Sequence, residues 1–530
     1  MFRIDAPPSP ALIPMTDAER LLYEQIVPAD HFLRRLLQAV DFASFRPLLA
    51  TAYSPDQGRP SLDPVVLLKL EVLARQYNLS NREVIAGGRF NIAYRWFLGL
   101  SLHSPLPHDS LLTYFRQRLG PERLQQVFDA LTGQARRLGL VKDRLRLKDA
   151  THVIANIAVP STIRLVAEVR DQLLAALRPF AAARVAEEAE RAAAIHGGSA
   201  DAPDVERLLQ RVTHLRAVLA WADAVPAQAG CGSRSAPDQE RLQAALALAH
   251  KILADRDDPE AGDKVISVQD PDARCGKHGA FFDGYLLDIA LDADSDFITA
   301  MNVLPANGDE GADAALLIAQ EEPAHGNDVA AIAIDGAGYR GPVLRELTDP
   351  QGLDLEVFAP PSTPPPPAGF PPERFSLTVL DDRPTLTCPA GQTTTQWERN
   401  AHDTGTKFRF SKKQCGSCAL RGECLAKPTA KSRTVIKNDY EAEYRAAQAQ
   451  AQTPEYAQVR KQHPAIERKL AELVKRHDLR HARYRGQGKV LYQALLTGLV
   501  VNLKRLVRWL FDPPAAATAG TVRAEPVGLS

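Results

Sequence analysis

A strand-like segment, separated from its sheet partners by a long helix-like stretch, constrains the fold of this chain most. Residues 144–153, RLRLKDATHV, alternate polar and apolar side chains as a half-buried strand does. Residues 160–260 then show helical spacing in an Ala-, Leu-, Glu- and Arg-rich composition, broken by Gly/Ser/Pro tracts near 197–203 and 226–238. We expect two or three antiparallel helices there, inserted as an arm into a sheet-forming domain.

Strand patterns return after this arm. The segments GYLLDIALDA (284–293) and DFITAMNVLP (296–305) predict a hairpin. An Ala/Leu-rich helix is expected near 311–320, followed by a buried-type strand at 329–334 and another strand at 353–359. The order is strand, helical insert, two antiparallel strands, helix, strand, helix and strand. This is a ribonuclease-H-like α/β order with an insertion after its first strand.

Length and composition divide the chain further. At roughly 150 residues per domain, the 530 residues predict three or four folding units. We expect an α/β fold class: an RNase H-like core with an all-helical N-terminal domain, a helical insertion and a small zinc-binding insertion. The predicted units are a lead segment at 1–55, a helical domain at 56–140, the core at 141–160 and 262–360, the insertion at 161–261, a proline linker and cysteine module at 361–440, C-terminal core helices at 441–512, and a disordered tail at 513–530.

The N-terminal helices have helix-turn-helix size. Apolar residues at 65–73 give the face of one helix, and Ser80 with Glu83 forms a capping box at the start of the next. A third helix should run from about 108 to Gly120, and Pro121 should open a fourth. The alternative is a helical bundle whose arginines are merely solvated.

Charge is balanced over the whole chain but not along it. Lys+Arg and Asp+Glu are both 64, yet residues 261–360 hold 19 acidic and 5 basic side chains, whereas 401–510 hold 23 basic and 9 acidic. Carboxylates in one segment and cations in another suit a metal-dependent enzyme that acts on a polyanion. No apolar run long enough for a membrane span and no secretory-type N-terminus is seen, so we expect a cytoplasmic protein without a membrane partner.

Three carboxylates are candidates for catalysis. Asp149 lies in the first strand pattern, Asp335 follows the apolar segment VAAIAI, and Glu467 lies on a basic helix, AIERKLAELVKRH. Two aspartates at neighbouring strand ends and one helical glutamate can converge on one point. Such a triad can hold two Mg²⁺ about 3.5–4 Å apart, with Mn²⁺ as a possible substitute, for in-line attack at phosphodiesters. Any single aspartate could equally be a solvated or capping residue.

Several motifs, in order, resemble the DDE transposases of bacterial insertion sequences, specifically the IS-eleven-eighty-two branch of the IS-four superfamily. The residues that carry this resemblance span about 55–510 and read GRPSLDPVVLLKL, YRWFLGL, HDSLLTYFRQRL, LKDATHVIAN, DPDAR, DGYLLDIALD, VLPAN, IDGAGYRG and AIERKLAELVKRHDLRHARYRGQGKVLYQALLTGLVVNLKRL.

The resemblance implies an RNase H-like catalytic core in which Asp149, Asp335 and Glu467 are the metal ligands. It also implies binding of double-stranded DNA, at the terminal inverted repeats and the target, by a homodimer or higher oligomer. The superfamily's helix usually reads Tyr-x2-Arg-x3-Glu-x6-Lys. Tyr456, Arg460, Glu467 and Lys475 follow that order here with looser gaps, so phosphate contacts are expected for the other three.

A dinucleotide-type fingerprint follows Asp335. Gly336, Gly338 and Gly341 have the G-x-G-x-x-G spacing after a strand, with an acidic residue about twenty positions on. However, Asp335 would face a pyrophosphate and Pro342 follows the third glycine. We therefore expect no nucleotide cofactor, and a sharp backbone turn beside the metal site instead.

Four clustered cysteines suggest a structural zinc site. Cys388, the pair Cys415-x2-Cys418, and Cys424 can supply a closed tetrahedral thiolate set. The surrounding module has few large apolar residues, so metal would supply much of its folding free energy. Free buried cysteines, an iron–sulfur site or His402 as a ligand are the alternatives, while Cys231 and Cys275 are expected to be unligated.

Basic residues near Glu467 and on the N-terminal helices are candidates for contacts with DNA phosphates. The predicted set is Arg460, Arg468, Lys475, Arg476, Arg480, Arg483, Arg485, Lys489, Arg116 and Arg118. A solvated basic face is the alternative.

These observations favour a DNA transposase that cuts and rejoins strands with divalent metal. Two other classes remain open: a catalytically inactive DNA-binding regulator derived from a transposase, and a metal-dependent nuclease without strand transfer.

Overall fold

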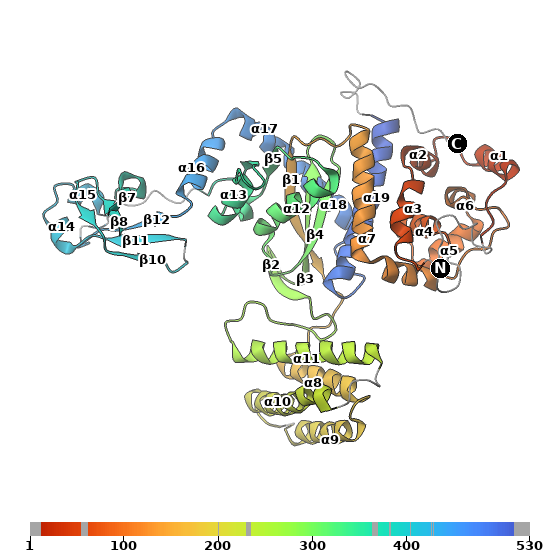
Figure 1. The fold of residues 1–530 in the computed structure, drawn as a ribbon, viewed down its shortest axis with the longest axis horizontal. Helices are drawn as coiled ribbons and strands as arrows, with labels where there is room; N and C mark the ends of the chain where they lie inside the picture. Colours follow the sequence, from red (N-terminus) through yellow and green to blue (C-terminus); the bar gives the residue numbers. More distant parts are fainter. Residues whose placement is uncertain are drawn as a thin grey trace.

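The computed structural model describes residues 12–54, 62–199, 201–228, 235–362, 369–380, 383–402, 404–425, 427 and 429–513. Figure 1 shows a central sheet with helices to one side of it, a stack of helices below it, and a small β-rich body at the far end from the N-terminal helices. Cys231 and the expected disordered tail, apart from its first residue Pro513, lie outside the described residues.

The central sheet has six strands. They are β1 (Arg146–Ile154), β2 (Arg274–His278), β3 (Ala280–Asp292), β4 (Ile298–Pro305), β5 (Ala331–Ala333) and β6 (Glu356–Phe358). The main path runs β2-β3-β1-β5-β6, and β4 also pairs with β3. Strand β3 is antiparallel to β1, β2 and β4, whereas β5 is parallel to both β1 and β6. The predicted strands and their order are confirmed, although β5 and β6 are shorter than expected.

Helices fill the N-terminal region. They are α1 (Asp17–Ile26), α2 (Phe32–Ala39), α3 (Arg46–Ala50), α4 (Pro64–Gln76), α5 (Asn81–Phe90), α6 (Ile92–Leu98) and α7 (Ser110–Arg137), with a 3-10 turn at Ala43–Phe45. The capping box at Ser80 and Glu83 is present. Gly120 interrupts α7 with a positive φ of 65°, so the two helices predicted around Gly120 and Pro121 are confirmed.

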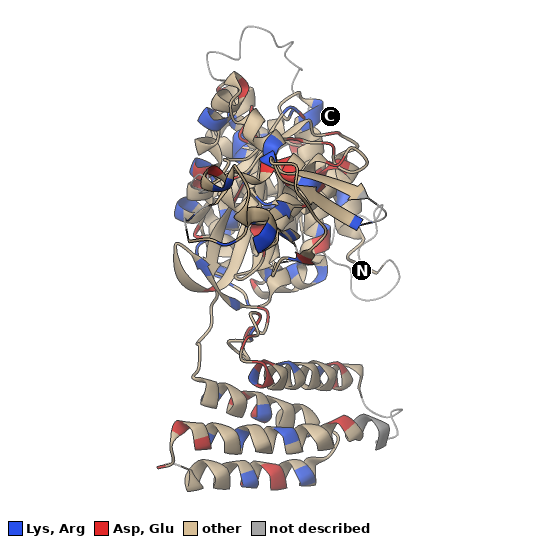
Figure 2. Ribbon diagram, turned by 90° about the vertical axis from the view of Figure 1, so that its left-hand side faces the viewer, with Lys and Arg blue, Asp and Glu red and all other residues tan. Residues whose placement is uncertain are grey.

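The inserted arm consists of four helices rather than two or three. They are α8 (Thr162–Leu177), α9 (Ala182–Gly198), α10 (Asp204–Gln228) and α11 (Ala236–Asp257). They pack around an apolar core of their own, separate from the main core. Figure 2 shows acidic and basic residues interspersed along these helices. Several of them form ion pairs one helical turn apart, as Arg164 does with Glu168, which is typical of a solvated helical surface.

The C-terminal helix α19 (Gln487–Phe511) joins the N-terminal helices to the sheet (Figure 1). It packs against α7, α2 and α4 on one side and β4 on the other. By length and composition it could cross a membrane, but 83% of its most apolar window is buried inside the protein. Its burial is that of a core helix, in agreement with the C-terminal core helices expected at 441–512.

Helices α12 (Glu310–His325) and α13 (Gly341–Thr348), and the 3-10 turn at Gly336–Gly338, lie between the later strands. After the cysteine module, the chain continues through α16 (Glu441–Gln450), α17 (Pro454–Gln462) and α18 (Pro464–His477). Helix α18 packs on β1, and α16 packs on α13 and β6. The C-terminal segment is thus helical and packs on the sheet, as predicted for the C-terminal core helices at 441–512.

The cysteine module contains two small three-stranded sheets. Its elements are a 3-10 turn at Pro372–Arg374, β7 (Ser376–Leu380), β8 (Arg383–Thr387), β9 (Thr393–Thr394), β10 (Trp397–Arg399), β11 (Gly405–Arg409), α14 (Lys412–Gly416), α15 (Arg421–Cys424) and β12 (Thr434–Asn438). Phe375, Phe408 and Phe410 are buried in its own apolar cluster. The module therefore has more apolar core than its composition suggested.

A buried ionic cluster fixes the start of β1. Arg146 is fully buried and pairs with Asp292 of β3 at 2.9 Å and with Glu321 of α12 at 2.7 Å, both also fully buried. Asp143 accepts a further bond from Arg146 at 3.1 Å, and Arg136 of α7 also reaches Glu321. This cluster joins the sheet to helices on both of its sides.

We predict that Arg146→Met lowers the free energy of unfolding by about 3–5 kcal/mol, because two buried carboxylates lose their partner. Urea denaturation measures the loss. Arg144→Met is the matched control, since Arg144 is half exposed and its pair with Asp294 should contribute about 0–1 kcal/mol. Equal losses in the two variants would contradict the role given to Arg146.

Candidate functional site

The pairing of β1 with β5 brings Asp149 and Asp335 together. The parallel register sets Arg146 beside Ile332 and Leu147 beside Ala333. Continued by two residues, it sets Asp149 beside Asp335, whose backbone is still extended. Because side chains alternate along a strand, both carboxylates project from the face that carries Leu147 and Ala333.

Local hydrogen bonds orient each carboxylate. Asp149 accepts a bond from the N–H of Ala150 at 2.8 Å, and Asp335 caps the following 3-10 turn by accepting from the N–H of Ala337 at 3.0 Å. Both residues are half-buried, and neither forms an ion pair with a described residue. Burial raises the pKa of Asp149 to about 6, and the charge of Asp335 adds to that rise.

Glu467 approaches the same region from α18. It lies in the first turn of that helix, which packs on β1, and it is exposed. Its neighbour His463 is buried, and burial followed by the charge of Arg460 lowers the pKa of His463. Glu467 and Asp335 both oppose that lowering, so His463 senses both carboxylates. Glu467 and Asp335 are thus related through the His463 ring that both carboxylates influence. No described interaction links Glu467 to Asp149.

A fourth carboxylate, which the sequence did not single out, lies near this pair. The charge of Glu310, the first residue of α12, also raises the pKa of Asp149. Lys148 holds this end of α12 in place by donating to the backbone carbonyl of Glu310 at 2.5 Å, while pairing with Asp288 at 2.9 Å. Only the folded contact identifies Glu310, because nothing in its sequence neighbourhood distinguishes it from other helix-opening acids.

Metal-binding geometry is not complete in either candidate site. Among the residues that the structure describes, no group of three or more His, Cys, Asp or Glu side chains is arranged to hold an ion. The carboxylates nevertheless fit a divalent cation chemically, because adjacent half-buried oxygen ligands without a counter-charge favour one.

The glycines after Asp335 serve packing and turning. A Cβ on Gly341 would meet the Cγ of Tyr440 at 2.2 Å, so α16 can approach only a glycine here. The N–H of Gly341 donates to the hydroxyl of Tyr444 at 2.8 Å and is therefore already engaged. These contacts account for a glycine at position 341 without a bound dinucleotide.

The predicted DNA-contacting residues fall into two groups. Four are exposed, and their side chains form no hydrogen bond or ion pair with another described residue: Arg468, Lys475, Arg476 and Lys489. Others are engaged within the protein: Arg460 donates to the carbonyl of Ile334, Arg480 to that of His152, Arg485 to that of Asn156, and Arg483 to the side chain of Asn78.

The expectation of an exposed arginine at 116 is wrong. The Arg116 side chain is only 15% exposed and pairs with buried Glu71 at 2.8 Å. Its guanidinium carbon also lies 5.8 Å from the ring centre of Tyr484. Arg118 is exposed, as expected, and lies over the ring of Tyr53. The sequence pattern could not separate the two, because the partners of Arg116 come from α4 and from the loop before α19.

The DPDAR motif anchors the loop that carries the basic run. Buried Asp270 accepts from the hydroxyl of Tyr285 at 2.6 Å and from the N–H of Gly486 at 3.0 Å. Asp272 accepts from the N–H of Gln487 at 3.0 Å. These bonds fix the start of α19, and with it Arg483, Arg485 and Lys489, against the sheet.

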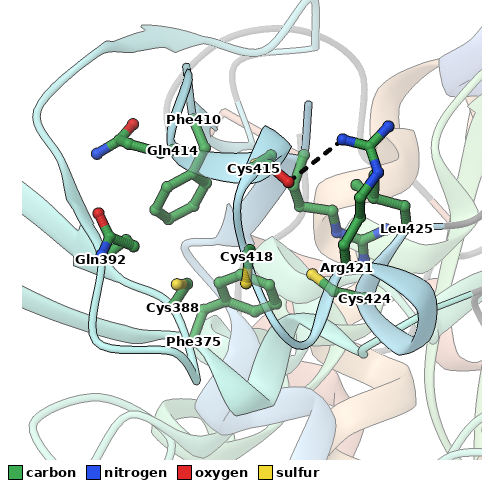
Figure 3. A pocket seen from close by; sticks show the side chains of 11 residues that line it. Phe375, Cys388, Gln392, Phe410, Gln414, Cys415, Cys418, Arg421, Cys424 and Leu425 are labelled. Atoms are coloured by element: carbon green, nitrogen blue, oxygen red, sulfur yellow. Dashed lines mark hydrogen bonds between the residues drawn. The ribbon is translucent and has the colours of Figure 1, made fainter. Parts of the chain in front are cut away.

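The four clustered cysteines line one pocket (Figure 3). Cys388 follows β8, Cys415 lies on α14, Cys418 follows it, and Cys424 ends α15. All four are free thiols of intermediate exposure. Burial raises the pKa of Cys424, and the three other cysteines contribute to the rise. The thiols are thus neighbours, although they do not form a coordination sphere.

We predict that Asp149→Asn stabilises the metal-free protein at pH 8 by up to about 3 kcal/mol. The folded-state pKa of Asp149, about 6, lies above its unfolded value of 3.8, so the folded state binds the proton more readily. Wild-type stability should therefore rise as the pH falls from about 6 to about 4, and the advantage of the variant should disappear. Urea denaturation across this range tests it.

Asp328→Asn, at an exposed position, is the control for that comparison and should show no such pH dependence. A variant at Asp149 that is less stable than the wild type at pH 8 would show that this carboxylate is not desolvated.

Comparisons with known proteins identify two parts of the chain. A family model described as a transposase domain (DUF772) matches residues 21–118. A second, described as a transposase DDE domain, matches residues 387–507. No curated protein and no solved structure matches the chain. The first match runs from within α1 to within α7, and the second runs from the end of β8 through the rest of the cysteine module and α16–α18 to most of α19. Two transposase domains in one chain support its assignment as a DDE transposase.

Proposed function

We propose that this protein is the DNA transposase of an insertion sequence, which binds the terminal inverted repeats and catalyses metal-dependent strand cleavage and strand transfer. The observation that carries the proposal is the pairing of Asp149 with Asp335 on adjacent strands, in a chain that contains transposase domains. The IS-eleven-eighty-two branch of the IS-four superfamily remains the specific family proposed.

The sheet supports an RNase H-like core. Strand β3 pairs antiparallel with both β4 and β1, and β5 and β6 continue from β1 in parallel. This arrangement agrees with the order derived from the sequence, with the arm α8–α11 inserted after the first strand.

Asp149, Asp335 and Glu467 are the proposed ligands of two Mg²⁺ ions, which Mn²⁺ could replace. Divalent cations would neutralise the carboxylates, activate the attacking hydroxyl and stabilise the leaving oxygen. The protein's own part is to hold Asp149 and Asp335 side by side through the β1–β5 register. Glu467 is exposed in the first turn of α18, a helix that packs on β1, and its convergence with the two aspartates is part of the proposal.

DNA binding is proposed for the exposed cations around α18 and the start of α19, together with Arg118 on α7. Arg468, Lys475, Arg476 and Lys489 are unengaged within the described structure and can neutralise phosphates. The N-terminal helices, with a helix-turn-helix-like arrangement, are proposed to hold the terminal repeats, and the active form is a homodimer or higher oligomer. The proposed location is the bacterial cytoplasm, at the nucleoid when bound to DNA.

Zinc is proposed as a structural ion of the cysteine module. The proposal is supported by the convergence of Cys388, Cys415, Cys418 and Cys424 on one pocket. The thiols would have to move closer together to reach Zn–S distances of about 2.3 Å.

We predict that Asp335→Asn abolishes strand cleavage but leaves DNA affinity unchanged or improved. The substitution removes a ligand of the catalytic cations and a negative charge that faces phosphate. The substrate is an oligonucleotide duplex carrying the inverted repeats found beside the gene, with Mg²⁺ present and absent. Cleavage and joining are followed on gels, and affinity by fluorescence anisotropy.

Asp328→Asn is the control for this experiment and should cleave as the wild type does. An Asp335→Asn protein that still cleaves would overturn the assignment of this residue. Wild-type cleavage without joining would mark the protein as a nuclease, and binding without any cleavage as a regulator.

We also predict that Cys418→Ser loses bound zinc and weakens DNA binding. The pH dependence of the free energy of unfolding that is due to Asp149 should stay unchanged. Metal analysis of the purified protein measures zinc per chain. Cys275→Ser, at an exposed cysteine far along the chain from the cluster, is the control. Zinc well below one ion per chain in the wild type, with four freely titrating thiols in the module, would refute the site.

A further inference from the structure

A polar pocket lies between the N-terminal helices and the C-terminal segment. It is bounded by α4, the start of α5, α7, the loop before α19, and α19 itself. Its principal polar lining residues are Arg75, Asn81, Arg116, Arg483, Tyr484 and Tyr492. The first three belong to the part matched by the DUF772 transposase domain, and the last three to the part matched by the DDE domain.

Two donors in this pocket are buried without a partner. Arg75 is 4% exposed; its Nε donates to the hydroxyl of Thr497 at 2.7 Å, but its Nη2 has no hydrogen-bond partner. Tyr492 is also 4% exposed, and its hydroxyl likewise has none. A buried donor left unsatisfied costs about 1–3 kcal/mol, so two of them in one pocket indicate a missing acceptor.

The charge balance indicates that this acceptor is an anion. Burial lowers the pKa of Arg75 to about 10, and the next largest cause is the positive charge of Arg483. The charges of Asp478 and Glu71 act in the opposite direction but more weakly, and Glu71 is already paired with Arg116. Arg483 itself donates to the neutral amide of Asn78. The positive charges of Arg75 and Arg483 thus repel each other, and the carboxylate that lines the same pocket, Glu71, is engaged with Arg116.

The two guanidinium groups and the phenol of Tyr492 form a donor set that suits the oxygens of a tetrahedral phosphate. We propose that this pocket binds one phosphate group of the DNA backbone, and that this contact ties the N-terminal helices to the catalytic segment when DNA is bound. The DNA part of this proposal rests on the proposed function; the phosphate part does not. Because Arg483 is exposed, it can turn from Asn78 toward an entering phosphate.

The first arm of the test measures inorganic phosphate on the full chain. Thermal unfolding is followed in sodium phosphate and in sodium chloride at equal ionic strength. Phosphate should raise the Tm above the chloride value in the wild type, since a ligand that binds the folded state stabilises it. Arg483→Gln should lose this increment. Tyr492→Phe, which keeps every charge, should bind phosphate about tenfold more weakly.

The second arm measures a nonspecific 20-base-pair duplex over a range of salt concentrations. If a backbone phosphate occupies the pocket, Arg483→Gln should reduce the slope of log K against log salt by about 0.9, the value for one phosphate contact. Arg164→Gln is the matched control, because it removes the same charge from the exposed surface of the arm. It should leave the phosphate increment and the slope unchanged.

Equal Tm values in phosphate and chloride would overturn the proposal, since the two donors would then be satisfied by water alone. A phosphate increment without any change of slope in Arg483→Gln would overturn the assignment to DNA. Failure of the transposase proposal would be distinct from either result, because it would appear as the absence of Mg²⁺-dependent cleavage by the wild type.

Discussion

The candidate active site depends on two residue pairs between β1 and β5. This short parallel pairing sets Asp149 beside Asp335, and a slip of one residue would send one carboxylate to the opposite face of the sheet. The buried cluster around Arg146 resists such a slip, because Arg146 is itself one of the paired residues and is bound to Asp292 and Glu321. The buried ionic cluster around Arg146 thus lies three residues along β1 from Asp149, one of the proposed metal ligands.

Helix α19 imposes the second constraint. Its apolar residues share one continuous core with the N-terminal helices and with the sheet. Gly498 allows this close approach, since a Cβ there would lie 2.3 Å from the sulfur of Met301. The N-terminal helices are therefore not tethered by a flexible linker, and DNA held by them would have a fixed position relative to the carboxylates.

Local patterns predicted much of this fold because local physics decides it. The capping box at Ser80, the break at Gly120 and the strand order each follow from short-range sequence signals. The predictions failed where distant partners decide. Arg116 has an exposed-type pattern, but Glu71 of another helix buries it. Glu310 is an ordinary helix-opening acid until the strands set it near Asp149.

Two further differences between prediction and structure concern the helical arm and the carboxylates. The sequence predicted two or three helices for the arm, and not four, because its Gly/Ser/Pro tracts mark only some of the turns. The short turn between α8 and α9 contains no such tract. The sequence placed Asp149 within a strand pattern and Asp335 just after one, and the structure agrees, although Asp149 lies inside β1 and not at its end as the convergence argument assumed. The distance between the two residues depends on a strand register that no sequence pattern reveals. Convergence of Glu467 with them depends on side-chain rotation and on cations, so it stays a prediction.

In the folded chain, many of the acidic residues between 261 and 360 have basic partners. Several of these carboxylates are neutralised internally: Asp288 by Lys148, Asp292 by Arg146, and Asp309 by Arg340. These ion pairs offset part of the local excess of acid without any ligand. Asp149 and Asp335 differ from these residues, since neither has an ion-pair partner within the described structure while both are half-buried. Uncompensated carboxylates at adjacent strand positions lower the stability of the metal-free fold. This cost supports the proposal that a divalent cation completes the site.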